Sequence, residues 1–129
     1  MTVQRLDSSS LFAPRIGFCS AVRAGDFVYL AGVTAIAGDG EVVGGDDPYL
    51  QARECTAKIG AALHALAARA DQVVQTRVYL TDPGHWQAVG RAHREAFGQA
   101  PPAATMVVVK QLLDPRMLIE IEAVAYIGD

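Results

Sequence analysis

The sequence predicts a single α+β domain over residues 1–129, in which a mixed β-sheet carries two helices on one face. The first observation is a set of alternating or continuous apolar runs, which indicate strands, and the second is a pair of segments with apolar residues three and four apart, which indicate helices. The third is their order, β-β-α-β-α-β-β, because strands separated by helical crossovers form a mixed sheet. The length also suits one core.

The first elements form a predicted β-hairpin. Residues 3–6 are a candidate edge strand, and a run of serines followed by Pro14 indicates a loop. Two strand-like runs follow, Phe18–Val22 and Phe27–Val33. The residues between them, Arg23-Ala24-Gly25-Asp26, favour a tight turn, and we therefore expect the two runs to pair.

The longest predicted helix extends from Pro48 to about Arg69. Asp47 suits the N-cap, and proline suits the first turn. Apolar residues recur at helical spacing on the face expected to meet the sheet: Ala52, Cys55, Ile59, Ala62, Leu63 and Leu66. Lys58 is expected to lie away from this face.

The second half of the chain supplies three strands and a helix. Val73–Leu80 alternates as a strand, and Thr81-Asp82-Pro83 ends it and caps a helix over residues 83–97. Thr105–Val109 is a continuous apolar run, which predicts a strand covered on both sides, and Leu118–Ile127 is a long alternating strand. In the second helix, four residues are expected to lie on one apolar stripe: Trp86, Val89, His93 and Phe97.

The composition favours association with other subunits. Apolar residues make up 51% of the sequence and charged residues 19%, and the mean hydropathy is +0.20. The element order also leaves one sheet face without cover from its own chain. We therefore expect a homo-oligomer in which another subunit covers this face.

Several classes of protein are disfavoured. The net charge of −3 and the scattered cationic residues give no basic footprint, so we expect no nucleic-acid partner. The first residues do not resemble a signal peptide, and no apolar run approaches the length of a membrane span, so a cytoplasmic protein is expected. Cys19 and Cys55 fit reduced thiols, and the spacing of His64, His85 and His93 gives no metal site.

Two glutamates in the last strand are candidates for chemistry. Glu120 and Glu122 are two residues apart and therefore point to one face, opposite to Ile119 and Ile121. If a second subunit covered them, burial would raise a carboxyl pKa toward values useful in general acid–base catalysis. For each glutamate the pattern leaves two interpretations open, a catalytic carboxylate or a solvated, salt-bridged sheet face.

Five segments together resemble the Rid family, also called YjgF-type proteins. They are Val28-Tyr29-Leu30-Ala31-Gly32, the helix after Asp47, Val78-Tyr79-Leu80-Thr81-Asp82, Pro102-Ala103-Ala104-Thr105-Met106-Val107 and Ile119-Glu120-Ile121-Glu122-Ala123. The resemblance covers about residues 16–127, with the elements in the family's order. It implies a chorismate-mutase-like fold of the bacillus type and a homotrimer. Three clefts between adjacent subunits would bind small carboxylic or keto acids.

The resemblance also implies an enamine/imine deaminase-like hydrolase. Such proteins convert 2-aminoacrylate-type intermediates, released by pyridoxal-phosphate enzymes, to 2-keto acids and ammonia, and they need no cofactor or metal. Glu120 matches the family glutamate that positions the attacking water. Ligand-binding backbone is expected at Gly32 and Thr105, with their neighbours Val33 and Met106.

The chain departs from the family's active deaminases at three positions. Ala104 stands where they have an arginine that grips the substrate carboxylate, Phe18 where they have a tyrosine, and Gly90 where they have an asparagine. Loss of one charge-assisted contact to a carboxylate costs about 2–5 kcal/mol in binding. The chain thus resembles an arginine-lacking subgroup, and ordinary 2-aminoacrylate hydrolysis is not expected. Four other cations could replace the lost charge: Arg77, Arg91, Lys110 and Arg116.

Three functional hypotheses follow. In the first, an interfacial cleft binds a small imine, enamine or carbonyl compound, and Glu120 orients water or moves a proton. In the second, the same trimer binds a metabolite without catalysis and regulates an enzyme. In the third, the cleft carries out a proton transfer, as in a tautomerase, within a specialised pathway.

Overall fold

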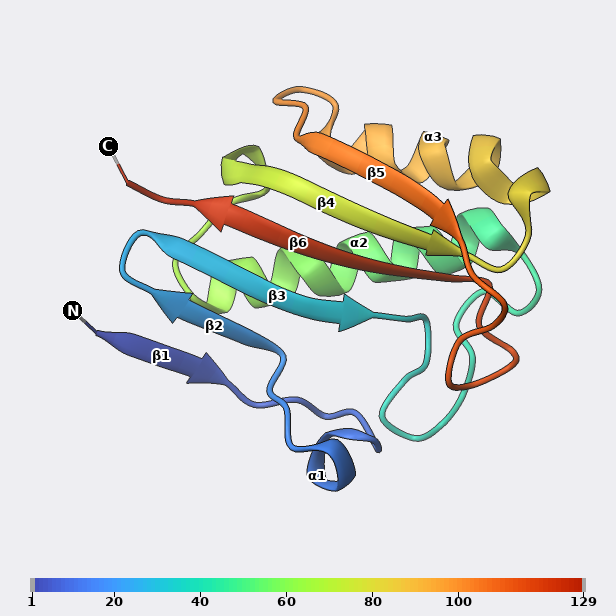
Figure 1. Ribbon diagram of the computed structural model, residues 1–129, viewed down its shortest axis with the longest axis horizontal. Helices are drawn as coiled ribbons and strands as arrows, with labels where there is room; N and C mark the ends of the chain where they lie inside the picture. The colour runs from blue at the N-terminus through green and yellow to red at the C-terminus, as the bar shows by residue number, and fades with distance from the viewer. Residues whose placement is uncertain (1, 129) are drawn as a thin grey trace.

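The computed structural model describes residues 2–128 and contains a six-stranded mixed sheet with both long helices on one side (Figure 1). The strands are β1 (Val3–Leu6), β2 (Ala21–Ala24), β3 (Phe27–Val33), β4 (Val73–Leu80), β5 (Ala103–Val108) and β6 (Ile119–Tyr126). The helices are α1 (Ala13–Ile16), α2 (Pro48–Ala65) and α3 (Trp86–Phe97), with short 3₁₀ turns η1 (Ala70–Gln72) and η2 (Pro83–His85).

The sheet has the strand order β1-β2-β3-β6-β4-β5. The β4–β5 pair is parallel, and all the other pairs are antiparallel. This confirms the predicted α+β class, the mixed sheet and the placement of both helices on one face. No helix within residues 2–128 combines the length and the apolar character that crossing a lipid bilayer requires.

The N-terminal region adds elements that the seven-element order lacked. Residues 3–6 form β1, which pairs antiparallel with β2 and confirms the candidate edge strand. The hairpin is also confirmed, but β2 begins at Ala21 and not at Phe18. The cause lies in the short helix α1, which was not predicted. Helix α1 ends at Ile16 and is capped by Gly17, whose backbone adopts φ 88° and whose N–H donates to the Ala13 carbonyl at 2.7 Å.

Helix α2 begins where predicted. The Asp47 carboxylate accepts hydrogen bonds from the backbone N–H groups of Tyr49 (2.9 Å) and Leu50 (3.2 Å). The helix ends at Ala65, four residues before the expected end, because Ala67 adopts a positive φ of 60°. Its apolar face packs on β3 and β6 and is fully buried at Ala52, Cys55, Ile59 and Leu63.

We expect Asp47→Ala to lower the free energy of unfolding by about 1 kcal/mol, since two N–H groups of the first helical turn lose their acceptor. Equilibrium urea denaturation followed by circular dichroism measures this change. Asp46→Ala, which removes an adjacent exposed carboxylate, is the matched control. An equal loss in both variants would contradict the capping role.

Two details of the second half differ from expectation. Trp86 is 58% exposed, so its expected place on the apolar stripe of α3 is wrong, while Val89 and Phe97 are buried as expected. Trp86 is the first residue of α3, directly after η2, and there its side chain lies outside the core. Strand β5 lies at the sheet edge with all six residues exposed, so the expectation of cover on both sides is not met within one chain.

The sheet face opposite to the helices carries large apolar side chains. Phe27 and Tyr126 pair across β3 and β6 with ring centroids 5.2 Å apart, and Tyr29 lies 6.2 Å from Phe27. All three are exposed in the single chain. This face and the exposed strand β5 together form an apolar surface of the kind that subunit contacts bury. The homotrimer itself stays a prediction.

Candidate functional site

The alternation of β6 places its two glutamates on the face away from the helices. Ile119 and Ile121 are fully buried beneath the helices, whereas Glu120 and Glu122 are partly buried on the opposite face. On the neighbouring strand β4, Tyr79 lies opposite Glu120 in the register. The strand pairing therefore gathers ionisable and polar side chains at one place on this face.

The two glutamates have different surroundings. Arg77 donates from Nη1 to Oε1 of Glu122 at 3.3 Å, and the Tyr79 hydroxyl donates to the same oxygen. This hydrogen bond to Glu122 is the largest cause of the raised pKa of Tyr79, ahead of burial. Glu122 therefore corresponds to the salt-bridged interpretation.

Glu120 has the surroundings of a candidate catalytic carboxylate. Burial, followed by the negative charge of Glu122, raises the pKa of its carboxyl, and no hydrogen bond within residues 2–128 opposes that shift. Two neighbouring carboxyl groups with diverging environments are typical of sites that separate a proton-transfer role from a structural role. Of the two glutamates, Glu120 is therefore the candidate for a proton-transfer role.

Glu120 lines a cavity of about 260 Å³ together with Gly32 and Phe18. A Cβ atom on Gly32 would overlap the Glu120 carboxylate, so glycine lets this group lie against the backbone of β3. The β3–β6 register shifts between Leu30 and Val33, which places a bulge at the same point. A glycine inside a strand signals such a bulge or a close approach.

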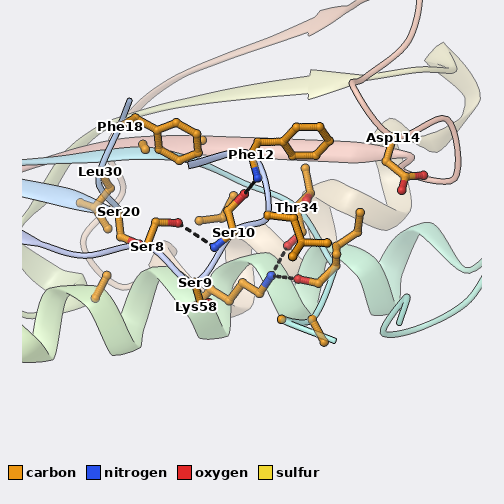
Figure 2. Close-up of a pocket in the computed structure, with 18 of the residues that line it drawn as sticks. Ser8, Ser9, Ser10, Phe12, Phe18, Ser20, Leu30, Thr34, Lys58 and Asp114 are labelled. Carbon is orange, nitrogen blue, oxygen red and sulfur yellow. Dashed lines mark hydrogen bonds between the residues drawn. The ribbon is translucent and has the colours of Figure 1, made fainter. Parts of the chain in front are cut away.

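A larger cavity of about 410 Å³ adjoins the first and shares Phe12, Phe18, Gly32 and Thr34 with it. It lies between α2, the end of β3 and the segment of residues 8–12. Figure 2 shows Lys58 reaching into this region from α2, near Ser10 and Thr34.

Sequence reasoning missed Lys58 as a site residue. The residue is half-buried and lines the larger cavity beside Ala61 and Ala62, so the expectation that it points away from the packed side of α2 is wrong. The signal was its spacing, because Lys58 lies three residues after Cys55 and four before Ala62.

The predicted ligand-binding residues fall into two groups. Phe18, Gly32, Val33 and Glu120 line the two cavities. The other four do not line them: Gly90, Ala104, Thr105 and Met106.

The strand register shows how the β5 residues of the second group are oriented. Thr105 pairs with Arg77, on the sheet face that carries the glutamates. Ala104 pairs with the buried Thr76, on the helix side of the sheet. One chain therefore does not bring the two groups together.

Of the four cations considered as replacements for the missing arginine, one lines a cavity. Arg77 pairs with Glu122, and Arg91 lies 3.8 Å from the centre of the Tyr49 ring. Arg116 lines the larger cavity but holds Asp114 through Nε (3.0 Å) and Nη2 (2.8 Å). The hydrogen bond from the Arg116 side chain is the largest cause that lowers the pKa of Asp114, to about 2.

Within residues 2–128 no three histidine, cysteine, aspartate or glutamate side chains come together as a metal-binding group. Cys55 is fully buried and donates from Sγ to the Val33 carbonyl, and desolvation raises its pKa to about 12. This thiol is a packing residue beneath β3.

The chain is similar to proteins from several microorganisms. The family described as endoribonuclease L-PSP matches residues 9–127. An uncharacterized protein of Streptomyces coelicolor, SCO2049, is 38% identical over 126 residues, which cover 98% of this chain and 93% of that protein. The RutC family protein PH0854 of Pyrococcus horikoshii is 36% identical over 111 residues, which cover 84% and 86%.

A solved structure shows the same fold. The crystal structure of Rv2704 from Mycobacterium tuberculosis, a member of the YjgF/YER057c/UK114 family, superposes with a TM-score of 0.87 and 38% identity. The match covers 97% of this chain and 99% of that one.

Proposed function

Because the chain belongs to the endoribonuclease L-PSP family, which is the YjgF/Rid family of small-ligand-binding proteins, we propose that its Glu120 cavity hydrolyses a small imine, enamine or related carbonyl compound. The observation that carries this proposal is the contrast between the two glutamates. Glu122 is paired with a cation, whereas Glu120 lines a cavity and has a raised pKa.

The geometry supports general base and then general acid catalysis by Glu120. The carboxylate accepts a proton from a water molecule as that water adds to the imine carbon. The same proton is then returned to the nitrogen, which gives a carbinolamine. Glu120 next accepts the hydroxyl proton of the carbinolamine and passes it to the nitrogen, so that the carbonyl forms as the C–N bond breaks and ammonia leaves. A carboxyl with a raised pKa suits both steps, because general acid–base catalysis is most effective when the pKa of the group lies closer to the working pH.

The complete cleft is proposed to lie between subunits of a homotrimer. Strand β5 is an exposed edge, and its Ala104, Thr105 and Met106 do not line the cavities of their own chain. In an assembled trimer, β5 and Gly90 of a neighbour would complete the cavity mouth. A monomeric mass in light scattering would contradict this arrangement.

A metabolite-binding protein without turnover is the second candidate. It is favoured by Ala104, which is an exposed alanine on β5 and supplies no charge where active deaminases have an arginine. A ligand that binds stoichiometrically and is recovered unchanged would identify this function. A tautomerase-like proton transfer would use the same Glu120 but release no ammonia.

The deciding experiment is a coupled ammonia and keto-acid assay with 2-aminoacrylate and longer 2-imino acids. We expect the unaltered protein to turn over the longer substrates and to show little activity on 2-aminoacrylate. Ala104→Arg should raise 2-aminoacrylate turnover about tenfold or more, because a guanidinium is a bidentate carboxylate partner.

Ala103→Arg is the matched control, since Ala103 precedes Ala104 on β5 and pairs with Gln75 on the other side of the strand. Absence of turnover in all three proteins, with every substrate of the series, would reject the hydrolase function.

A further inference from the structure

We propose that the larger cavity is an anion subsite in which Lys58 anchors the carboxylate of a ligand whose reactive carbon lies beside Glu120. The inference rests on the proposed function, because it assigns the recognition of the ligand to the same pair of cavities. It names the ligand class as an amphipathic monocarboxylic acid, larger than the three-carbon 2-aminoacrylate.

The Lys58 ammonium is held at the cavity wall by backbone carbonyls. Nζ donates to the carbonyls of Thr34 at 2.6 Å and Ile36 at 2.5 Å (Figure 2). An ammonium has three N–H donors, so one remains after these two bonds. None of the three ion pairs within residues 2–128 includes Lys58. The charge of Lys58 is therefore positioned but not neutralised by a carboxylate.

The charges around the larger cavity leave a net value of +1. Three charged side chains line it, Lys58, Arg116 and Asp114. Arg116 and Asp114 neutralise each other through two hydrogen bonds. The remaining positive charge is that of Lys58, which matches one carboxylate and not a phosphate dianion.

Serine hydroxyls supply further donors to an anion. The Ser8 and Ser10 side-chain oxygens each accept a backbone hydrogen bond, from Ser10 N (3.0 Å) and Phe12 N (3.1 Å) respectively. Since a hydroxyl is both donor and acceptor, these bonds leave its proton free to donate. Ser20 lines the same cavity.

The rest of the wall is apolar and too large for a three-carbon acid. Leu11, Phe12, Phe18, Leu30 and Ile36 line the cavity of about 410 Å³. Ligand pockets of roughly 300–1,000 Å³ hold molecules of drug-like size, and such walls favour a ligand with a hydrophobic part. An acid with an aromatic or branched side chain fills this space, and 2-aminoacrylate leaves most of it empty.

A purely structural role for Lys58 makes a different prediction. If the ammonium only ties residues 34–36 to α2, its replacement lowers stability but does not change the preference between a charged and a neutral ligand. The comparison of an acid with its amide therefore separates anion binding from loop anchoring.

The test uses isothermal titration calorimetry with phenylpyruvate and its neutral primary amide, phenylpyruvamide. We expect the unaltered protein to bind the acid at least about tenfold more tightly than the amide. Lys58→Met and Lys58→Gln should bring the ratio of the two affinities close to one. Lys58→Gln retains N–H donors for the Thr34 and Ile36 carbonyls, and circular dichroism verifies that each variant is folded. Lys110→Met, which removes an exposed lysine that lines neither cavity, should keep the ratio.

Three outcomes would overturn the inference. They are an unchanged ratio in both Lys58 variants, a ratio lost in Arg116→Met but kept in Lys58→Met, and equal binding or no binding of acid and amide by the unaltered protein. Imine turnover together with any of these results would leave the hydrolase standing and remove Lys58 as the anchor. A Lys58-dependent preference without turnover would support the subsite and reject the hydrolase.

Discussion

Glu120→Gln is expected to lower imine turnover by about 10²–10⁴-fold and to stabilise the folded chain at neutral pH. The loss follows because an amide neither takes a proton from water nor returns it to the leaving nitrogen. The gain follows because the folded chain holds this carboxyl partly buried, near the negative charge of Glu122. Turnover is therefore expected to fall while stability rises, as is common where an active site holds a partly buried charge.

The direction of the pH dependence follows from the raised pKa. The folded chain binds the Glu120 proton more tightly than the unfolded chain, whose pKa is near 4.5. This contribution to stability is complete below the unfolded pKa and is lost as the pH rises through the folded pKa. The free energy of unfolding of Glu120→Gln should thus exceed that of the unaltered protein above pH 4.5, and the difference should increase until Glu120 is fully ionised.

Urea denaturation midpoints between pH 4 and 8, together with kcat, measure both effects. Glu122→Gln is the matched control, since it removes the same charge from the same face but breaks the contacts with Arg77 and Tyr79. That variant should show no comparable gain in stability. An equal gain in both variants, or full turnover in Glu120→Gln, would contradict the assignment of Glu120.

Gly32→Ala is expected to reduce turnover by about 10²-fold while the fold is retained. The new methyl group would occupy the place of the Glu120 carboxylate. Because this carboxylate is the free end of a flexible side chain, we expect it to move away from the water that it is proposed to activate, while the strand backbone stays in place. Gly32 does not have a positive φ, so alanine introduces no backbone strain there.

The measurement is kcat beside a thermal unfolding curve for each variant. Gly60→Ala serves as the control, because its added Cβ, on α2, meets no atom within 4 Å. It should keep full activity and gain slightly in stability from the higher helix propensity of alanine. Unaltered turnover in Gly32→Ala would show that the Glu120 carboxylate need not lie against β3.

Elements with local signals were predictable from the sequence. The start of α2 follows from Asp47 and Pro48, and β4 and β6 follow from their alternating patterns. Helix α1 and the late start of β2 were not predicted, because they depend on the left-handed conformation of Gly17. The apolar pattern of β5 predicts burial but does not say which chain provides the cover, and within one chain this strand is exposed.

The residues of the candidate site were predictable only where the side-chain pattern of the sequence indicates them. The alternation of β6 set Glu120 and Glu122 on one face, and the resemblance selected Glu120. The two glutamates differ because Arg77 and Tyr79 bind Glu122, and these two residues are 43 or more positions away from it in the sequence. The helical spacing of Lys58 from Cys55 and Ala62 could have placed it beside the cavity, but the backbone carbonyls that hold its ammonium are not revealed by any side-chain pattern.

The cavity and the core draw on different stretches of the chain. The fully packed core consists of residues from Ala21 onward, whereas residues 8–18 supply one wall of the larger cavity and none of that core. Six residues of this stretch line the cavity without belonging to that core: Ser8, Ser9, Ser10, Leu11, Phe12 and Phe18. Substitutions at these six positions are therefore expected to alter which molecule is accepted at little cost to folding. A scaffold organised in this way would let ligand preference change at those six positions while the architecture is retained.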